Sequence, residues 1–334
     1  MPDIIVMGDI NVDVVFTIPS YPLSGTEAVA TSMQMHTGGS AVNTAIALAK
    51  MDMDVGFIGR VGSDSLAKQV LEDLMAAGVD CSAIQIDPKV STGLIFIAVT
   101  VDGERTMFGA RGANSFTQAN VIDPAYFKNC RWIHLSSYSF LAQHQYETIL
   151  TVLDIAENSP HTRVSLDIGT EPALRARSQI VDLFPRIDVL LPNEQEVTLL
   201  AKRPSIEDSL SYLLNGKGAS AIITKRGTNG CLLAVGDKRA YVPSFDVKVK
   251  DTTGAGDSFN AGVVLGRLVG LSWESSAALG NALGGLVTMH DGSGAASLNR
   301  NDVSKLIEQH YFKDEWASAR PALEELTAWF EGII

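Results

Sequence analysis

The sequence has few of the features that mark secreted, metal-rich or membrane proteins. Its 334 residues include three cysteines, Cys81, Cys130 and Cys231, and none has a CxxC neighbour. This spacing excludes a disulfide framework and argues against a zinc site. No uncharged apolar run is long enough to span a membrane, and the first residues lack the basic and apolar regions of a signal peptide. We therefore expect a cytoplasmic protein.

Positive charge is also scarce. The chain has 26 Lys and Arg against 38 Asp and Glu, a formal net charge of −12. Nucleic acids and anionic membranes require clustered basic residues, so we expect neither as a partner. Two common nucleotide-binding motifs are missing as well. Ser211 stands where a P-loop ending in Gly216-Lys217 needs glycine, and no GxGxxG follows the first apolar run.

Short apolar runs alternate with helix-period segments along most of the chain. Leu66, Val70, Leu71 and Leu74 form one apolar stripe after the cap signal Ser63-Asp64, and residues 149–155 carry another. Such alternation predicts a doubly wound α/β fold, in which helices flank both faces of a mainly parallel sheet. The expected strands are residues 4–7, 55–58, 132–135, 164–168, 189–191, 221–224 and 232–235.

Two segments break this alternation. Residues 12–18 and 92–101, the latter followed by 105–110, favour strands with no helix between them, and Asp102-Gly103 is a hairpin-turn signal. They predict a small antiparallel sheet, formed by about residues 11–36 and 92–111, within a single domain of residues 1–334. This sheet would be a lid over a site, an edge extension or a dimer surface.

The sharpest motif is Asp251-Thr252-Thr253-Gly254-Ala255-Gly256-Asp257-Ser258-Phe259, directly before a helical pattern. Small residues at the start of a helix let backbone N–H groups converge on an anion, which the helix dipole also favours. Asp257 in the first turn would lie beside that anion and accept a proton from an attacking hydroxyl. A Gly-rich turn with an acidic helix start is common, so the shorter GxGD pattern alone would not predict catalysis.

The complete nine-residue motif resembles the signature of the ribokinase-like (PfkB) family of carbohydrate and nucleoside kinases. The resemblance extends over nearly the whole chain. It implies an ATP-dependent phosphotransferase with an alcohol group as acceptor. By this resemblance Gly254, Ala255 and Gly256 form the anion hole for the transferring phosphate, and Asp257 is the catalytic base.

Two further segments resemble the acceptor-binding elements of that family. Paired glycines in the run from Thr37 to Asn43 allow a ligand to approach the backbone closely, and an Asn side chain can bind hydroxyls. The run from Gly8 to Asp13 follows the first expected strand. Taken alone, a turn and an exposed carboxylate are the simpler interpretations. The resemblance assigns acceptor binding to Asn11, Asp13, Gly38, Gly39 and Asn43.

The nucleotide side rests on three weaker resemblances. The NxxE element at Asn193 implies magnesium and phosphate binding, mostly through water, although an Asn helix cap explains the same residues. The turn after Lys225 implies contact with ATP, although a plain hairpin turn is a competing interpretation. Asp251 and Thr253, with the Gly292-Ser293-Gly294 turn, resemble a monovalent-cation site, for example for potassium. The implied residues are Asn193, Lys225, Gly227 and Asn281 for the nucleotide and Glu196 for Mg²⁺.

The identity of the acceptor is less well marked. Ser40 stands where ribokinase-like and phosphofructokinase-like members commonly carry Lys, and Ser136-Ser137-Tyr138 replaces a ribokinase Glu. The missing lysine argues against a sugar phosphate, and both differences argue against D-ribose. Arg111 would hold a substrate carboxylate, steady the ATP phosphates or lie solvated at the surface. We expect phosphorylation of a hydroxymethyl group on an unphosphorylated sugar or sugar derivative. A nucleoside kinase and a non-catalytic sensing protein are the alternatives, and a homodimer through the lid is expected.

Overall fold

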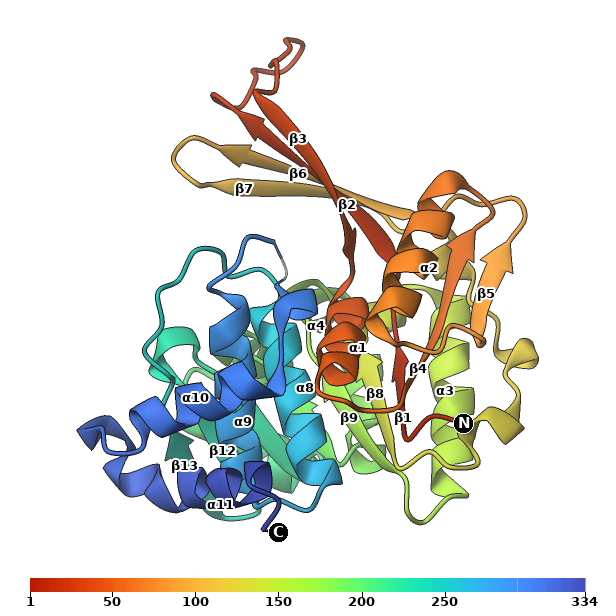
Figure 1. The fold of residues 1–334 in the computed structure, drawn as a ribbon. Coiled ribbons are helices and arrows are strands. Elements are labelled where there is room, and N and C mark those ends of the chain that lie inside the picture. The colour runs from red at the N-terminus through yellow and green to blue at the C-terminus, as the bar shows by residue number, and fades with distance from the viewer. Residues whose placement is uncertain (293, 334) are drawn as a thin grey trace.

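The computed structural model describes residues 1–292 and 294–333 and contains two sheets (Figure 1). In the larger sheet, seven neighbouring strands are parallel, and two further strands, β12 and β13, pair in antiparallel fashion at one edge. From one edge to the other, the strands are β13 (Lys238–Val242), β12 (Cys231–Val235), β11 (Ala221–Lys225), β10 (Val189–Leu191), β9 (Arg163–Asp167), β8 (Trp132–Ser136), β1 (Ile4–Met7), β4 (Val55–Gly62) and β5 (Ile84–Asp87).

Helices cover both faces of this sheet because successive strand residues point to opposite sides. In β1, Ile4 and Val6 belong to one buried cluster, and Ile5 and Met7 to the other. The first cluster is covered by α1 (Ser40–Lys50), α2 (Ser65–Ala77), α8 (Ala255–Leu268), α9 (Trp273–Val287), α10 (Arg300–His310) and α11 (Arg320–Phe330). The second is covered by α3 (Gln143–Glu157), α4 (Thr170–Arg175), α5 (Arg177–Asp182), α6 (Glu194–Ala201) and α7 (Ile206–Ser211). The expected doubly wound α/β fold is confirmed.

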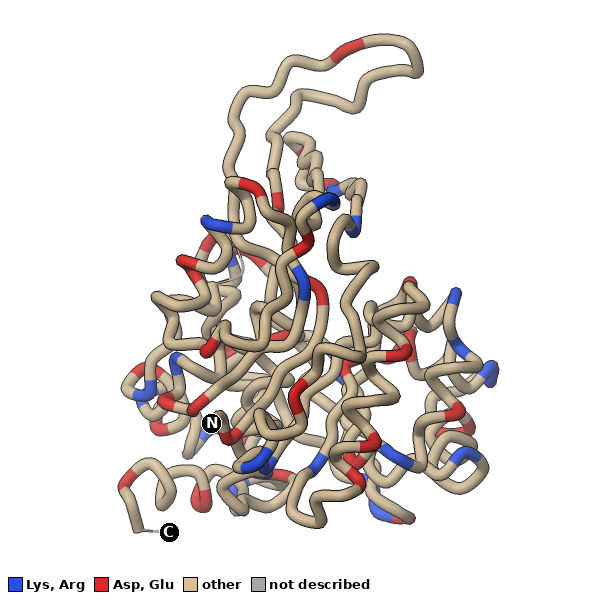
Figure 2. Tube along the Cα trace, turned by 90° about the vertical axis from the view of Figure 1, so that its right-hand side faces the viewer, with Lys and Arg blue, Asp and Glu red and all other residues tan. Residues whose placement is uncertain are grey.

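A smaller sheet projects from the main sheet at the carboxyl end of β1 (Figure 1). Its strands are β3 (Ser32–Gly38), β2 (Asn11–Ile18), β6 (Gly93–Thr100) and β7 (Arg105–Ala110), in that order. β2 pairs with β3 and β6 with β7 in antiparallel fashion, and the two hairpins join through a parallel pairing of β2 with β6. Few charged residues lie along this sheet, whereas the main body carries many (Figure 2).

All seven strands expected for the main sheet are present, and β4 continues to Gly62, beyond the expected residue 58. The cap signal before α2 is confirmed at Asp64, whose side chain accepts from the backbone of Ala67. Three strands were not predicted, namely β3, β5 and β13. Each lies at the edge of its sheet and buries few side chains, so its apolar pattern is weak.

Two expected absences concern covalent links and membrane insertion. All three cysteines carry free thiols. Within residues 1–292 and 294–333, no helix combines the length and the apolar character needed to cross a membrane.

Candidate active site

Predicted site residues from two motifs meet at the carboxyl ends of the parallel strands, where α1 and α8 begin. β1 lies between β4 and β8, at the point where the strand order changes direction. Ligands of doubly wound sheets bind beyond the carboxyl ends of the strands at this point. Asn43 and Ser40 on α1 both contact Asp257 on α8, so two motifs far apart in the sequence form one cluster.

Asp257 occupies the first turn of α8, whose N-cap Gly254 has a φ of 76°. This left-handed conformation suits glycine, which has no Cβ. Asn43 Nδ2 donates to Asp257 Oδ2 over 2.8 Å, and Ser40 Oγ lies 2.7 Å from Oδ1. Burial, followed by the charge of Asp167, raises the pKa of Asp257 to about 6. The carboxylate is ionised at neutral pH but binds a proton more tightly than an exposed one, as a general base requires.

The glycine pair and β2 form a second wall. A Cβ on Gly38 would come within 2.3 Å of the Asp13 carboxyl group, and one on Gly39 within 2.4 Å of the Asp9 carbonyl oxygen. Gly39 also has a φ of 111°. The side chain of Asp13 therefore lies against the backbone of Gly38. Burial, and then the charge of Asp257, raises the pKa of Asp13 to about 6.

The side-chain amides of Asn11 and Asn43 differ in whether their oxygen atom already accepts a hydrogen bond. Asn11 Oδ1 accepts from Asn114 Nδ2 over 2.9 Å. Asn43 uses its Nδ2 for Asp257, while its Oδ1 is buried and has no hydrogen-bond partner among the described residues. An unpaired buried acceptor is costly, so a bound hydroxyl that donates to Asn43 would remove that cost.

Asn193 and Glu196 form a complete capping box at the start of α6. Asn193 Oδ1 accepts from the Glu196 N–H over 2.9 Å, and Glu196 Oε2 accepts from the Asn193 N–H over 2.8 Å. Thr170 donates to Glu196 Oε1 over 3.1 Å. Burial raises the pKa of Glu196 despite the nearby positive charge of Lys225. The helix-cap interpretation is therefore confirmed, and each carboxylate oxygen keeps a lone pair for a further donor.

A cavity of about 490 Å³ adjoins the first turn of α8. Five residues with predicted nucleotide or phosphate roles line it, namely Lys225, Gly227, Ala255, Gly256 and Asn281. Asn281 Nδ2 donates to the carbonyl oxygens of Val242 and Pro243 over 3.2 and 2.8 Å, so it also fixes the chain that forms one wall. The predicted nucleotide residues on β11, α8 and α9 thus share one cavity, whereas Asn193 is not among its lining residues.

The predicted monovalent-cation residues are engaged by an arginine of the small sheet. Arg105 Nη2 lies 2.6 Å from Asp251 Oδ1, and its Nη1 donates to Thr253 Oγ1 over 2.7 Å. Asp251 Oδ2 accepts from the Gly292 N–H over 3.2 Å. Ser293, which belongs to the same predicted site, lies outside the described residues. A guanidinium therefore supplies the positive charge at Asp251.

Arg111 does not lie solvated at the surface, so that interpretation was wrong. Its guanidinium pairs with both carboxylate oxygens of Asp9, over 2.8 and 3.0 Å, and it also donates to Gln145. Arg111 follows β7, whereas Asp9 precedes β2, so this bidentate pair ties together the two ends of the small sheet. The Nη1 atom is buried and has no partner among the described residues.

A model of the pfkB family of carbohydrate kinases matches residues 1–300. The chain belongs to the PfkB family. The ATP-dependent ribose-1-phosphate kinase of Halopiger xanaduensis is 30% identical over 289 residues, which cover 86% of this chain and 93% of that protein. Fructokinase-1 of Zea mays is 28% identical over 321 residues, which cover 92% of this chain and 98% of that protein.

Solved structures share the fold. A ribokinase II from E. coli in complex with ATP and Mg²⁺ has a TM-score of 0.82 at 23% identity, covering 93% of this chain and 100% of that one. Arabidopsis thaliana ribokinase complexed with ribose and ATP has a TM-score of 0.78 at 24% identity, covering 91% and 98%. As a PfkB family member, this chain is an ATP-dependent phosphotransferase of the sugar kinase class.

Two further residues of this cluster, Asp167 and Ser40, carried no functional prediction from the sequence. Asp167 Oδ1 accepts from Lys225 Nζ over 2.8 Å, and its Oδ2 lies 2.9 Å from Ser40 Oγ. In the sequence, Ser40 was noted only because it replaces a lysine that is common in relatives. The available signal was position, because Asp167 is the penultimate residue of the predicted strand 164–168 and so lies at the carboxyl ends of the parallel strands.

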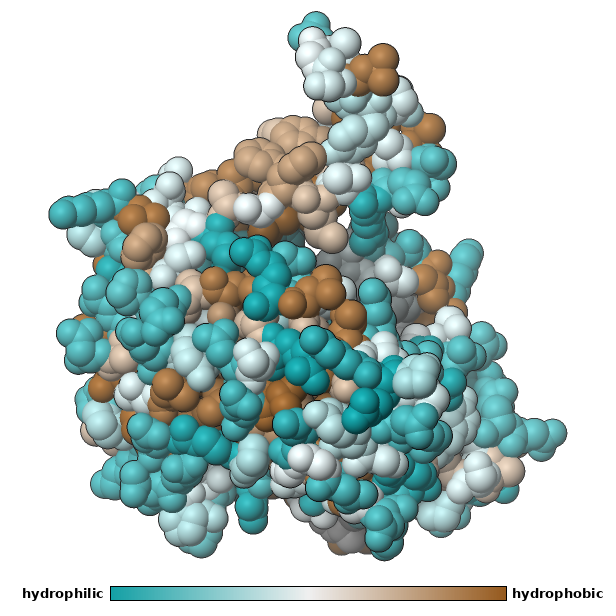
Figure 3. All heavy atoms as spheres, turned by 180° about the vertical axis from the view of Figure 1, so that it is seen from behind, coloured by the Kyte–Doolittle hydropathy of each residue, from teal (hydrophilic) through white to brown (hydrophobic). Residues whose placement is uncertain are grey.

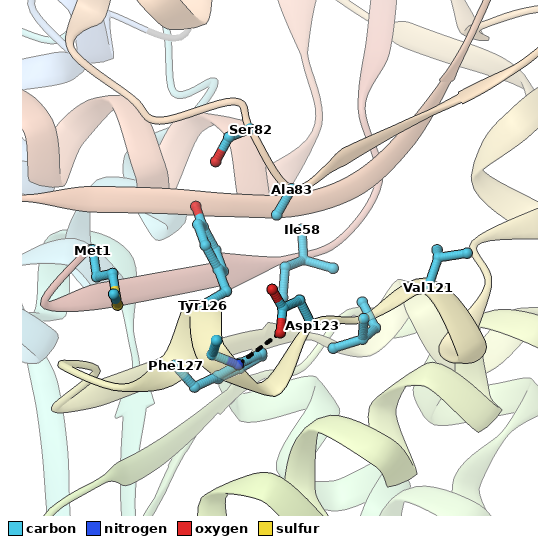
Figure 4. Close-up of a pocket in the computed structure, with 10 residues that line it drawn as sticks. Met1, Ile58, Ser82, Ala83, Val121, Asp123, Tyr126 and Phe127 are labelled. Atoms are coloured by element: carbon cyan, nitrogen blue, oxygen red, sulfur yellow. Dashed lines mark hydrogen bonds between the residues drawn. The ribbon is translucent and has the colours of Figure 1, made fainter.

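A second cavity, of about 340 Å³, lies away from these residues (Figure 4). Met1, Ile58 and Phe127 line it together with the polar side chains of Ser82, Asp123 and Tyr126. Its carboxylate, Asp123, accepts from the Ala125 N–H over 2.9 Å and caps a short helix. Its lining residues include no Lys or Arg to bind phosphate, whereas Lys225 and Arg226 line the first cavity.

Proposed function

We propose that this chain transfers the γ-phosphoryl group of ATP to a hydroxymethyl group of an unphosphorylated sugar or sugar derivative. The observation that supports this most strongly is the position of Asp257. It follows Gly256, which lines the cavity of about 490 Å³, and it accepts from Asn43, whose Oδ1 has no hydrogen-bond partner among the described residues. Asp257 accepts the proton of the attacking hydroxyl. The acceptor is oriented by Asn11, Asp13, Gly38, Gly39 and Asn43, and phosphoryl charge is stabilised by the N–H groups of Gly254, Ala255 and Gly256.

The charges around the acceptor support an unphosphorylated substrate. Arg111 is paired with Asp9, and Lys225 is paired with Asp167. Asp13 and Asp257 add two carboxylates to the same cluster. A second phosphate at the acceptor would therefore meet more negative charge than unpaired positive charge. The similarity to a ribose-1-phosphate kinase makes ribose 1-phosphate the sharpest competing acceptor to test.

Mg²⁺ is the expected partner of ATP, and the residues present fit it. Glu196 is held by Asn193 and Thr170, so its carboxylate is fixed in one orientation, and one carboxylate with ATP oxygens and waters is sufficient for Mg²⁺. When bound, Mg²⁺ would neutralise charge on the phosphates. A monovalent cation at Asp251 and Thr253 has to compete with Arg105. We propose potassium binding there only for a state in which Arg105 has moved away.

The small sheet, about residues 11–36 and 92–111, is proposed as the lid of a single domain of residues 1–334 located in the cytoplasm. On its face away from Asp13, the β-register aligns Met35, Val14, Phe96 and Phe108 in one row. Apolar side chains also gather on this sheet in the view from behind (Figure 3). We propose that this outer face packs against a second copy of the chain. The molar mass in solution, measured by light scattering, tests this.

A nucleoside kinase is the alternative. It would need an aromatic side chain that can stack on the base, and the structure reduces the number of candidates. Phe96 and Phe108 lie on the outer face of the lid, so neither is placed to stack on a base near Asp13. Tyr138 packs against Gly169, where a Cβ would come within 2.6 Å of its ring. Burial, and then the charge of Asp167, raises the pKa of Tyr138 to about 12. Tyr138 is thus the aromatic residue available to a base.

The experiment is ADP release by the purified chain with Mg-ATP. The acceptors are ribose, fructose, a keto-deoxy-gluconate, ribose 1-phosphate, and purine and pyrimidine nucleosides. We expect turnover with one unphosphorylated sugar, and Asp257→Asn should reduce it by about a thousandfold or more while ATP affinity stays nearly unchanged. Turnover with ribose 1-phosphate alone contradicts the unphosphorylated acceptor, and turnover with nucleosides alone supports the alternative. ATP binding without turnover on any acceptor favours a sensing protein.

A further inference from the structure

Asp167 lies at the centre of the site, although no sequence motif marks it. It is the last residue of β9, which has parallel neighbours on both sides, and it is 5% exposed. Its two carboxylate oxygens have different partners. Oδ1 accepts from Lys225 Nζ over 2.8 Å, and Oδ2 lies 2.9 Å from Ser40 Oγ. Asp167 thus contacts one residue on the nucleotide side and one on the acceptor side.

Ser40 connects Asp167 to the proposed base. Its Oγ lies 2.7 Å from Asp257 Oδ1 in addition to its contact with Asp167. A serine hydroxyl has one proton, so it can donate fully to only one of the two carboxylates. The other contact becomes a full hydrogen bond only when that carboxyl group is protonated. Through this hydroxyl, the protonation of Asp257 is coupled to the charge of Asp167.

Lys225 is held so that one of its N–H bonds has no partner in the part of the chain that the structure describes. An ammonium group has three donors, and two of them go to Asp167 and to Asn260 Oδ1, the latter over 3.3 Å. The Nζ atom lies beside the proposed anion hole, because a Cβ on Gly256 would be 3.6 Å from it. Although burial lowers it, the pKa of Lys225 is raised overall, chiefly by the charge of Asp167. The ammonium therefore stays charged next to Gly256.

We propose that Asp167 is a positioning residue for phosphoryl transfer, which holds the Lys225 ammonium beside Gly256 and, through Ser40, orients Asp257. This proposal rests on the proposed function. A fixed ammonium is most useful where charge develops on the transferring group. The charged or ionisable groups that act on Asp257 are Asp13 on β2, Asp167 on β9, Lys225 on β11 and Tyr138. Of these, Asp167 raises the pKa of Asp257, and Lys225 lowers it.

The test is the pH dependence of kcat/KM for two variants whose acid limbs should move in opposite directions. Asp167→Asn removes a negative charge next to Asp257, so the pKa of the base falls and the acid limb moves to lower pH. Ser40→Ala removes a hydrogen bond that favours the ionised base, so the acid limb moves to higher pH. Asp167→Asn should also lower kcat by about 10- to 100-fold, with the KM for the acceptor within about threefold.

Two further variants separate this role from a structural one. Asp167→Glu keeps the charge and should keep the acid limb of the wild type. Asp188→Asn is the matched control, because Asp188 pairs with Arg163 and the Val164 N–H at the opposite end of β9. It should change thermal stability without moving the acid limb. If Asp167→Asn does not fold, Ser40→Ala still tests the coupling. Unmoved acid limbs, with kcat within about twofold of wild type, overturn the proposal.

A second measurement does not depend on the acceptor. The carboxyl carbon of Asp257 can be titrated by NMR in protein labelled with ¹³C at aspartate, and Asp257→Asn identifies its signal. The apparent pKa should fall in Asp167→Asn and rise in Ser40→Ala. An unchanged titration in both variants overturns the coupling. If the two variants show these opposite shifts but the wild type phosphorylates no acceptor, the coupling holds and the proposed function is overturned instead.

Discussion

At the scale of single residues, the site is built from carboxylates that burial has made unusually basic. Asp13 and Asp257 both have a pKa raised to about 6, with burial as the main cause in each. Asp167 has its pKa lowered instead. Burial raises this pKa, but the charge and hydrogen bond of Lys225, together with the contributions of His134 and Asn260, outweigh burial. Asp167 thus binds its proton more weakly than Asp13 and Asp257 do, because of its neighbours.

The basicity of Asp257 has a cost in stability that can be measured. Its pKa is about 6 in the folded chain against an ordinary value of 3.8, so the folded chain binds the proton more tightly. The stability from this carboxyl group is fully present below pH 3.8 and is lost as the pH rises through about 6. Asp257→Asn should therefore raise the Tm at pH 8 by roughly 3 °C, and by less at pH 5.

Differential scanning fluorimetry at the two pH values checks this prediction. The control is Asp208→Asn, which changes an exposed carboxylate at the start of α7, away from this cluster. An Asp257→Asn variant that is less stable than wild type at pH 8 would show that the carboxylate contributes to stability there.

The sequence identified the residues that belong to motifs and missed those that act through position. Asp257, Asn43 and Gly38 were predicted, and the structure brings them together. Asp167 was not predicted as functional, because its role depends on the pairing of β9 with its neighbours and on the reach of Lys225 from β11. The partner of Arg111 was missed for the same reason, since Asp9 is 102 positions away in the sequence.

At the scale of elements, the hairpin of β2 and β3 meets α1 at two glycines. Glycine is required at each position for a different structural reason. Gly38 faces the flexible carboxyl group of Asp13, whereas Gly39 combines a φ of 111° with a backbone oxygen 2.4 Å from any Cβ. A side chain can move away, but a backbone in the core cannot do so cheaply. The two positions should therefore respond differently to the same substitution.

Gly38→Ala should raise the acceptor KM by about tenfold or more, because Asp13 is displaced, with a Tm close to wild type. Gly39→Ala should lower the Tm by several degrees and abolish most turnover. Gly78→Ala is the matched control, because Gly78 has a φ of 97° with no atom within 4 Å of a Cβ, so only backbone strain is added. Equal effects of the first two variants on Tm would contradict the distinction between them.

The predicted and missed elements differ in burial. The strands at the centre of the main sheet are almost entirely buried, and their continuous apolar runs were found. By contrast, β3, β5 and β13 lie at sheet edges, where one neighbour and solvent impose little pattern on the sequence. These three strands form because hairpins and crossovers bring them beside a neighbouring strand, and the local sequence does not reveal that pairing.

At the scale of the whole molecule, the tip of the small sheet reaches the main body through Arg105. Its contacts with Asp251 and Thr253 join β7 to the loop that leads into α8. Arg105→Ala should raise the acceptor KM several-fold and make turnover sensitive to potassium, because Asp251 loses the guanidinium. The Tm should barely change, since a partly exposed ion pair is worth about 1 kcal/mol or less.

Steady-state kinetics with and without potassium tests this prediction. Arg186→Ala is the control, because Arg186 pairs with Asp154 and Glu157 on the main body and not with the small sheet. Potassium activation of the wild type to the same extent as of Arg105→Ala would show that Arg105 does not compete with the cation.

The way in which the small sheet is attached has a consequence for protein engineering. Its two hairpins leave and rejoin the main body at neighbouring points, where Asn114 binds the backbone of Ile10 through both an N–H and a carbonyl. The main sheet lies entirely outside these segments. Residues 11–38 and 93–110 therefore form a cassette that can be exchanged between related chains, provided that Asp9, Arg111 and Asn114 are kept as its attachment points. Such chimaeras offer a route to new acceptor preferences on an unchanged phosphate-transferring body.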